Sequence, residues 1–293
     1  MAEQDKNLVL VTGDLGYGVL DDFERKFPNQ FFNAGVTEQS MTSLSAGLSS
    51  MGFRVFVYSI GNFSTFRCLE QIRNDVCLMN SSVVIVSVGA GYSYGAQGYT
   101  HHVIEDLSIM RALPNMKLLS PCNTFEVEHL TKSLCSSSGP AYLRLGTTSQ
   151  MLEMFNTNPF DLGKFRSLRS GNQGSILFTG SIGEIAIDAA NELQKFGVSL
   201  SVYSVPYISE LDKIHLAEIA KTGLILTLEE NCGEGGFGAS IVETLSDLNI
   251  SCRTKRFFAL RTDLLEVGNQ HYLRKWNGLS TQSIIDYVIQ TLD

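Results

Sequence analysis

No stretch of this sequence is apolar for long enough to cross a bilayer, and its first residues lack the apolar core of a signal peptide. Cations are also scarce, because 22 Lys and Arg stand against 30 Asp and Glu, for a net charge of -8. Nucleic-acid binding needs cations gathered on one face, and no basic run occurs. The six cysteines form no Cys-x-x-Cys pair, which indicates reduced thiols. We therefore expect a cytoplasmic protein that binds neither nucleic acid nor membrane.

A nucleotide-binding glycine loop is missing as well. The segment Gly89–Gly95 follows an apolar run, but Tyr94 stands where the third glycine of G-x-G-x-x-G belongs. The segments Thr179–Gly183 and Gly235–Gly238 are typical of tight turns and closely packed helix starts. No G-x-x-x-x-G-K-[ST] loop occurs. These glycines do not predict a nucleotide-binding enzyme.

Short apolar runs alternate with helical patterns along the 293 residues, of which 44% are hydrophobic. This alternation favours βαβ units and a mostly parallel sheet covered by helices. The first series of predicted strands is Leu8–Thr12, Phe53–Tyr58, Val83–Val88, Lys117–Leu119 and Tyr142–Leu145, with helices near Thr37–Ser50, Phe63–Met79, Glu105–Ala112 and Thr124–Ser136.

A polar segment over residues 150–173 separates this series from a second one and predicts a linker. The second series has strands Ser175–Thr179, Ser199–Tyr203, Leu224–Leu228 and Arg253–Phe258, with helices Glu184–Phe196, Leu211–Lys221, Gly238–Leu245 and Thr281–Leu292. The length suits two domains. We therefore predict two stacked α/β domains, 1–149 and 174–293.

The first candidate functional residue, Glu38, lies in the segment 31–41. An apolar strand ends at Asn33, Gly35 permits a turn, and Thr37 is suited to cap the helix that follows. Glu38 then lies in the first helical turn, at the edge of the sheet where α/β proteins bind their ligands. Taken alone, such a glutamate only complements the helix dipole.

Two further segments give Glu38 a context. An aromatic turn over residues 58–66 follows the second long strand and leads into a helix. After the third strand, a glycine-rich loop presents the adjacent histidines His101 and His102. The alternative interpretation is that these two histidines lie on the surface and have no functional role.

Together these segments resemble the transketolases and deoxyxylulose-phosphate synthases. The family pattern is Asn-x-Gly-x-x-Glu, an aromatic turn, Gly-x-Asp-Gly-x-Thr-His, then Glu-x-x-x-x-x-Arg-x-x-Pro-Asn. The matching positions run through Glu38, Phe63, His101 and Arg111 in that order. Further landmarks at 141–146, 179–181, 228–230 and 235–238 extend the resemblance over nearly the whole chain.

The resemblance implies a catalytic site that uses thiamine diphosphate. Glu38 matches the glutamate that hydrogen-bonds the aminopyrimidine N1' and so promotes removal of the thiazolium proton. Phe63 matches an aromatic residue that packs on the pyrimidine, with Ile60 and Phe66 as neighbouring cofactor-binding positions. His101 matches the histidine that contacts the substrate and transfers protons or stabilises oxyanions near its carbonyl. His102 is a second substrate-binding candidate.

Departures from the family pattern concern the substrate. Gln97 replaces an aspartate that contacts a sugar hydroxyl, and it keeps the capacity to hydrogen-bond. Gly18, Gly89 and Thr147 replace a serine, a histidine and an arginine at phosphate-binding positions. Because arginine binds phosphate in a bidentate manner, its loss weakens recognition of a sugar phosphate. The resemblance then suggests another substrate, such as a nucleotide-linked or unphosphorylated sugar or keto compound.

The diphosphate half of the site is absent from the sequence. Family members bind the diphosphate and Mg2+ with a Gly-Asp-Gly and a downstream Asn, and this chain has no Gly-Asp-Gly. The resemblance thus implies an N-terminal partner subunit and an α2β2 heterotetramer. Two alternatives stay open: the beta subunit of a 2-oxo acid dehydrogenase, and a non-catalytic assembly or regulatory subunit. The Gly98–His101 segment favours the transketolase branch over the dehydrogenase.

Overall fold

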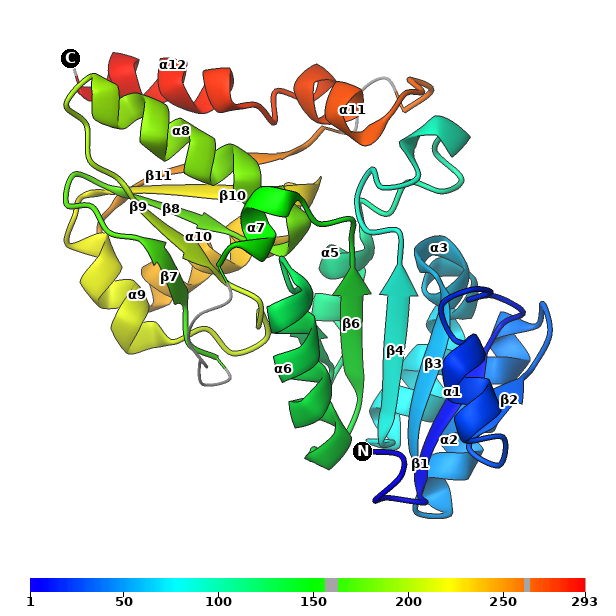
Figure 1. Cartoon of the computed structure of the whole chain (residues 1–293). Helices are drawn as coiled ribbons and strands as arrows, with labels where there is room; N and C mark the ends of the chain where they lie inside the picture. Colours follow the sequence, from blue (N-terminus) through cyan, green and yellow to red (C-terminus); the bar gives the residue numbers. More distant parts are fainter. Residues whose placement is uncertain (156–162, 261–263, 293) are drawn as a thin grey trace.

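The apolar runs of the first half form one parallel six-stranded sheet in a computed structural model that describes residues 1–155, 163–260 and 264–292 (Figure 1). Parallel strands of this kind are buried on both faces, which explains their continuous apolar character. The strands are β1 (Leu8–Thr12), β2 (Phe31–Asn33), β3 (Arg54–Ile60), β4 (Val83–Val88), β5 (Lys117–Leu119) and β6 (Ala141–Leu145), in the order β2-β1-β3-β4-β6-β5.

Helices cover both faces of this sheet, as right-handed crossovers between parallel strands require (Figure 1). One face carries α1 (Asp21–Lys26) and α6 (Thr124–Ser136). The other face carries α2 (Glu38–Ser50), α3 (Gly61–Ser64), η1 (Phe66–Cys68), α4 (Leu69–Gln71), η2 (Ile72–Leu78) and α5 (Asp106–Arg111). The short turn η3 (Gly95–Gln97) lies in the loop after β4.

The predicted helix Phe63–Met79 is wrong as a continuous α-helix. The chain breaks at Thr65, whose backbone has φ -116° and ψ -78°, and whose hydroxyl donates to the carbonyl of Gly61. The last part, Ile72–Leu78, is π-helical. Such interruptions are frequent at functional sites, and this one lies between Phe63 and the rest of the helical run.

The second half forms a five-stranded sheet in the order β11-β10-β8-β9-β7, parallel except for the edge strand β7. The strands are β7 (Arg166–Arg169), β8 (Ser175–Phe178), β9 (Ser201–Ser204), β10 (Leu224–Cys232) and β11 (Arg253–Ala259). The remaining elements are α7 (Gln150–Glu153), η4 (Gly180–Ile182), α8 (Gly183–Lys195), α9 (Lys213–Ala220), α10 (Phe237–Asp247), α11 (Gln270–Trp276) and α12 (Thr281–Leu292). Helices α8 and α12 lie together on one face, and α9 and α10 on the other (Figure 1). The prediction of two α/β domains is confirmed.

The segment expected to link the domains has structure of its own. It contains α7 and the edge strand β7, which pairs antiparallel with β9. Residues 156–162 of that segment lie outside the described residues. Strand β7 therefore belongs to the second sheet, although its polar residues did not predict a strand.

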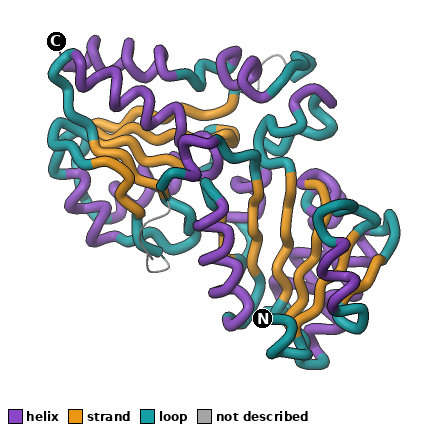
Figure 2. The backbone as a smooth tube through the Cα atoms, in the orientation of Figure 1, coloured by secondary structure: helices purple, strands orange, loops and turns teal. Residues whose placement is uncertain are grey.

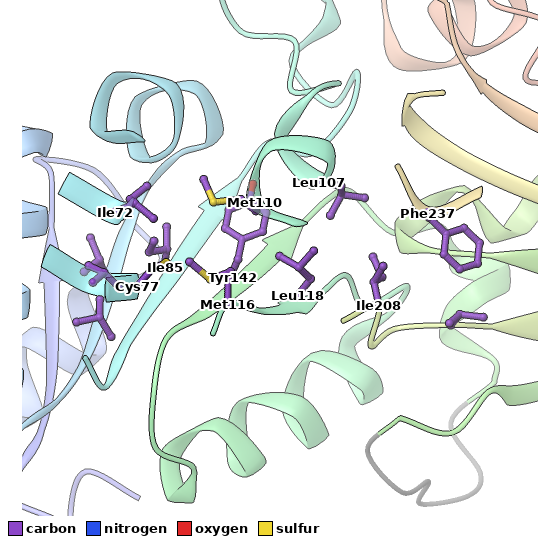
Figure 3. Packing of buried hydrophobic residues seen from close by; sticks show 14 of the residues in the cluster. Ile72, Cys77, Ile85, Leu107, Met110, Met116, Leu118, Tyr142, Ile208 and Phe237 are labelled. Atoms are coloured by element: carbon purple, nitrogen blue, oxygen red, sulfur yellow. The ribbon is translucent and has the colours of Figure 1, made fainter. Parts of the chain in front are cut away.

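The two domains share one apolar core. Figure 2 shows two groups of strands, and the close-up in Figure 3 shows the side chains that join them. Leu118 and Tyr142 of the first sheet belong to the same buried cluster as Ile208 and Phe237 of the second domain. Backbone hydrogen bonds also cross the junction: Ser120 N donates to Pro206 O at 2.8 Å, and Ile208 N donates to Leu118 O at 2.9 Å. The two domains are therefore joined by a shared core and by backbone hydrogen bonds.

No helix in the described part of the chain is long and apolar enough to cross a membrane.

Candidate active site

Glu38 is the first residue of α2 and is almost completely buried, with 1% of its side chain exposed. The helix begins there because the chain turns at Gly35, which has φ +70°. Thr37 precedes the helix but does not cap it, contrary to expectation, since its hydroxyl donates to the carbonyl of Ala34 at 2.7 Å. A carboxylate at a helix N-terminus is favoured by the helix dipole. Its burial at the carboxyl edge of the sheet is what distinguishes Glu38 from an ordinary helix-start acid.

The carboxylate of Glu38 faces Arg67, which the sequence did not single out. Arg67 Nη1 lies 2.9 Å from Glu38 Oε2, and the Arg67 side chain remains 47% exposed. The same guanidinium lies 4.6 Å from the centroid of the Phe63 ring. This arrangement places a cation at the solvent side of the buried carboxylate.

Phe63 and His101 form the next layer of the site. Their ring centroids are 5.6 Å apart at an interplanar angle of 69°. Phe63 lies in α3, directly after β3 ends at Ile60, and His101 lies in the loop after β4. Glu38, Phe63 and His101 thus follow three separate strand ends, with Arg67 linking Glu38 to Phe63 and the Phe63 ring packing against His101.

The histidine loop has local hydrogen bonds that set its shape. Thr100 Oγ1 lies 3.0 Å from His101 Nδ1, and Asn62 Nδ2 donates to the carbonyl of Thr100 at 2.6 Å. Asn62 was not predicted, and it ties this loop to the start of α3. Its Oδ1 is buried without a hydrogen-bond partner in the described structure, so an acceptor is available beside Phe63.

The other predicted site residues lie at different depths. His102 is buried, with its ring 5.2 Å from that of Tyr92 and its Nε2 3.1 Å from Gly95 O. Gln97 is exposed at the end of η3, and Phe66 is half-buried in η1. His102 thus packs into the loop, whereas Gln97 is open to solvent.

Of the three substituted phosphate positions, Gly89 lies beside Tyr94 and Thr147 beside Ser93, whereas a Cβ at Gly18 would meet nothing within 4 Å. A Cβ at Gly89 would come within 2.3 Å of Cε2 of Tyr94, so that ring fills the space beside Gly89. Thr147 is exposed, and its amide donates to Ser93 Oγ at 3.4 Å. Burial, and secondarily the nearby Tyr94, raise the pKa of Tyr58. The space beside Gly89 is therefore taken by an aromatic ring and not by a cationic side chain.

A buried polar network holds the end of the loop that carries His101 and His102. The Asp106 carboxylate accepts from Arg144 Nε at 2.7 Å and from the Tyr142 hydroxyl at 2.6 Å. Arg144 Nη2 also donates to Val103 O at 2.7 Å, immediately after the two histidines. Burial, and then the charge of Asp106, raise the pKa of Tyr142 well above its usual value, so Tyr142 stays a neutral donor. The end of the histidine loop is thereby fixed to the core.

The glycine segment near 235 holds no vacant anion site. Glu229 Oε2 accepts from Phe237 N and Oε1 from Gly238 N, both at 2.7 Å. A Cβ at Gly236 would come within 2.5 Å of Glu229 Oε2. Close packing of a helix start was the expected reason for these glycines, and the structure confirms it.

The residues of the site fit one end of a flat heterocyclic cofactor. Glu38 offers a buried carboxylate, Phe63 an aromatic face, and Asn62 an unpaired buried acceptor, which together suit a nitrogen heterocycle that carries an amino group. No group of three or more His, Cys, Asp or Glu that could hold a metal ion occurs within residues 1–155, 163–260 and 264–292.

Fold and site define a two-domain α/β protein whose first sheet presents a buried carboxylate and an aromatic ring at its carboxyl edge. Family models agree: residues 1–150 match the transketolase pyrimidine-binding domain, and residues 163–284 match the transketolase C-terminal domain. The chain belongs to the transketolase family, whose members depend on thiamine diphosphate.

Relatives of known name include one of similar length. It is a subunit of the apulose-4-phosphate transketolase of Phocaeicola vulgatus, 33% identical over 288 residues, covering 97% of this chain and 91% of the relative. The 1-deoxy-D-xylulose-5-phosphate synthase 2 of Geobacter sulfurreducens is 32% identical over 289 residues, or 97% of this chain. The chain spans only 46% of that synthase.

A solved structure has the same extent. A split-gene transketolase, determined as an inactive β4 tetramer, superposes with a TM-score of 0.87 and 27% sequence identity. The superposition covers 99% of this chain and 93% of that one. In extent, this chain therefore corresponds to the β subunit of two-chain transketolases.

Proposed function

We propose that this chain is the catalytic β subunit of a two-chain, thiamine-diphosphate-dependent enzyme. The enzyme transfers a two-carbon ketol or acyl unit to an aldehyde or keto sugar. The observation that carries the proposal is the convergence of buried Glu38 with Phe63 and His101 at the carboxyl edge of the first sheet. When bound, thiamine diphosphate supplies a carbon nucleophile that adds to a substrate carbonyl.

Each side chain has a distinct task in this proposal. Glu38 holds a proton at the pyrimidine ring, and its burial shields that hydrogen bond from water. Phe63 packs on the ring, with Ile60 and Phe66 as flanking cofactor-binding residues. His101 moves a proton or stabilises negative charge at the substrate oxygen, next to Gln97. His102, buried beside Tyr92, contributes to the substrate side through the shape of the loop.

A second chain completes the site in this proposal. An N-terminal transketolase-like subunit supplies the diphosphate and Mg2+ ligands, and two copies of each chain form an α2β2 heterotetramer. Support comes from the Phocaeicola vulgatus relative, which is named as one subunit of its enzyme, and from the solved split-gene transketolase, which is described as an inactive β4 tetramer. Six free thiols in the described structure support a cytoplasmic location.

The substrate of the enzyme is proposed to lack a terminal phosphate. Gly18, Gly89 and Thr147 offer no cation, and the Tyr94 ring takes the space beside Gly89. Steady-state turnover of xylulose 5-phosphate should be compared with that of unphosphorylated and nucleotide-linked donors. Efficient use of the phosphate ester would contradict this part of the proposal.

The decisive experiment is reconstitution with the N-terminal subunit from the same organism. Binding of thiamine diphosphate is titrated into each chain alone and into the mixture, and ketol transfer is then measured. We expect binding and turnover only in the mixture, and loss of turnover on Glu38→Gln. Glu70→Gln is the matched control, because Glu70 is exposed on α4. Activity that survives Glu38→Gln would refute the catalytic role.

The same experiment separates the alternatives. Turnover of a 2-oxo acid with a lipoyl acceptor, and not of ketoses, would assign the chain to the dehydrogenase branch. Assembly with the partner without any cofactor binding would identify a non-catalytic subunit.

A further inference from the structure

The loop that carries Gln97 and His101 lies directly against the C-terminal domain. A methyl group on Gly95 would come within 2.5 Å of the carbonyl oxygen of Gly268 and 2.6 Å of Leu273 Cδ1. Gly91 has φ +62° and is equally close to Glu230, whose Cβ would lie 2.6 Å from an added Cβ. Two glycines thus allow the backbone of this loop to touch the second domain.

Side chains and backbone groups of the C-terminal domain hold both ends of the loop. Gln270 Nε2 lies 3.4 Å from Ser93 Oγ and 3.2 Å from the Glu230 carboxylate. At the other end, Cys232 N donates to Ile104 O at 2.5 Å. An apolar cluster fills the space between, and its fully buried members are Tyr92, Ile104, Ala259 and Leu273.

The opposite side of the loop contacts the first domain. Asn62 donates to Thr100 O, the Phe63 ring packs against the His101 ring, and Arg144 Nη2 donates to Val103 O. Glu38, by contrast, is held by elements of the first domain alone, α2 and the Arg67 side chain. Among the described residues, the C-terminal domain therefore contacts the loop of His101, whereas the ion-pair partner of Glu38 belongs to the first domain.

We infer that Gly95 and Gln270 are positioning residues through which the C-terminal domain fixes the loop of Gln97 and His101. The inference rests on the proposed function, which assigns these two side chains to the substrate. Its physical basis is that a displacement of a substrate-contacting side chain by about 1 Å can slow the chemical step strongly. A loop pressed against Gly268 and Leu273 cannot retreat from the substrate. The C-terminal domain thus sets the chemical step, whereas the first domain sets the affinity for the cofactor.

Hydrogen–deuterium exchange of the free full-length chain tests the positioning itself. The amides to follow belong to Gln97, Gly98, His101 and His102, each of which donates a hydrogen bond within the loop. The variants are Gly95→Ala, which forces the loop off Gly268, and Gln270→Ala, which removes its tether to Ser93. The controls are Gly47→Ala in α2, where an added methyl meets nothing within 4 Å, and Gln282→Ala, which loses only an exposed bond to Asp286.

We expect both loop variants to exchange these amides roughly tenfold faster, as a loss of loop protection predicts, with the controls unchanged. Exchange rates equal to those of the controls would overturn the inference. If Gly95→Ala does not fold, as judged by its circular dichroism, Gln270→Ala decides the matter. Alanine suits a helix start at position 270, so this variant should fold.

A second measurement with the reconstituted enzyme separates positioning from general damage. We expect kcat to fall about tenfold in the loop variants, while the Kd for thiamine diphosphate stays within about twofold of the wild-type value. An unchanged kcat, or an equal loss of cofactor affinity, would contradict the inference. If Glu38→Gln retains activity, the proposed function fails, yet the exchange rates still decide whether the C-terminal domain holds the loop.

Discussion

Arg67 places its guanidinium 2.9 Å from the buried carboxylate of Glu38 while nearly half of its own side chain stays in solvent. It also lies over the Phe63 ring, with its central carbon 4.6 Å from the ring centroid. One cation therefore contacts both groups that are proposed to hold the pyrimidine. Because it is partly solvated, it can move away from Glu38 at a smaller cost than a buried partner would.

Replacing Arg67 with alanine should destabilise the free chain, because the buried carboxylate of Glu38 then lacks its partner. Solvent screening reduces the effect, so we expect a loss of about 1 kcal/mol in the free energy of unfolding at pH 7. Urea denaturation measures the change. Arg73→Ala, an exposed arginine bonded to Asn74, is the control and should be neutral. A neutral Arg67→Ala would show that the ion pair contributes nothing to stability.

Removing the Phe63 ring should weaken cofactor binding in the reconstituted enzyme. Lost packing on a flat ring corresponds to about 1 kcal/mol, or roughly a fivefold higher Kd for thiamine diphosphate. Isothermal titration with the mixture of subunits gives the value. Phe66→Ala is the comparison, and equal effects of both variants would assign the stacking role to neither ring in particular.

Asp106 should be among the residues on which the fold depends most strongly. Asp106→Asn removes the carboxylate that pairs with the buried Arg144 guanidinium, and it replaces one of the two oxygens that accept from Arg144 with an amide donor. Breaking such a pair costs about 3–5 kcal/mol. Urea unfolding at neutral pH should show this loss, and Asp22→Asn on the surface should not. A small effect would mean that water or a rearranged acceptor compensates Arg144.

Stability should fall as the pH rises between about 4.5 and 7 because of Glu229. Burial raises the pKa of this carboxyl from 4.5 to about 7, against the amides of Gly238 and Phe237 and the charges of Arg144 and Arg256. The folded chain binds this proton more tightly than the unfolded chain does. This stabilisation is complete below the pKa that Glu229 has in the unfolded chain. It is lost as the pH rises through the pKa of Glu229 in the folded chain, and the loss is on the order of 3 kcal/mol.

The Glu229→Gln variant checks this linkage. Its free energy of unfolding should vary less between pH 4.5 and 7 than that of the wild type. Glu218→Gln, on an exposed turn of α9, should keep the wild-type slope. Identical slopes for all three proteins would assign the pH dependence to other groups.

Strands were easier to predict than the helical run next to the site. The runs Leu8–Thr12, Val83–Val88 and Lys117–Leu119 form strands with the predicted bounds, because their β-branched and apolar residues suit a sheet buried on both faces. Strand β7 and helix α11 were missed, since polar residues dominate both. The break at Thr65 depends on a side chain that bonds back to Gly61, and apolar periodicity does not reveal such a bond.

The sequence predicted candidate site residues more readily than their surroundings. Glu38, Phe63 and His101 were predicted from ordered motifs and stay candidates, and in the structure Arg67 links Glu38 to Phe63, whose ring packs against His101. Arg67 and Asn62 were missed because an arginine or asparagine in a helical turn has no distinctive pattern. The contact of Gly95 with Gly268 joins residues 173 positions apart, so only the fold reveals it.

The shared core at the domain junction limits where a polypeptide of this family can be divided between two genes. A break between residues 155 and 163 would separate Leu118 from Ile208 and Tyr142 from Phe237, and it would leave both pieces with exposed apolar surface. Neither piece would bury its share of this core by itself. The pyrimidine-binding and C-terminal domains are thus expected to fold as one cooperative unit, and a cut between them would expose the core that both share.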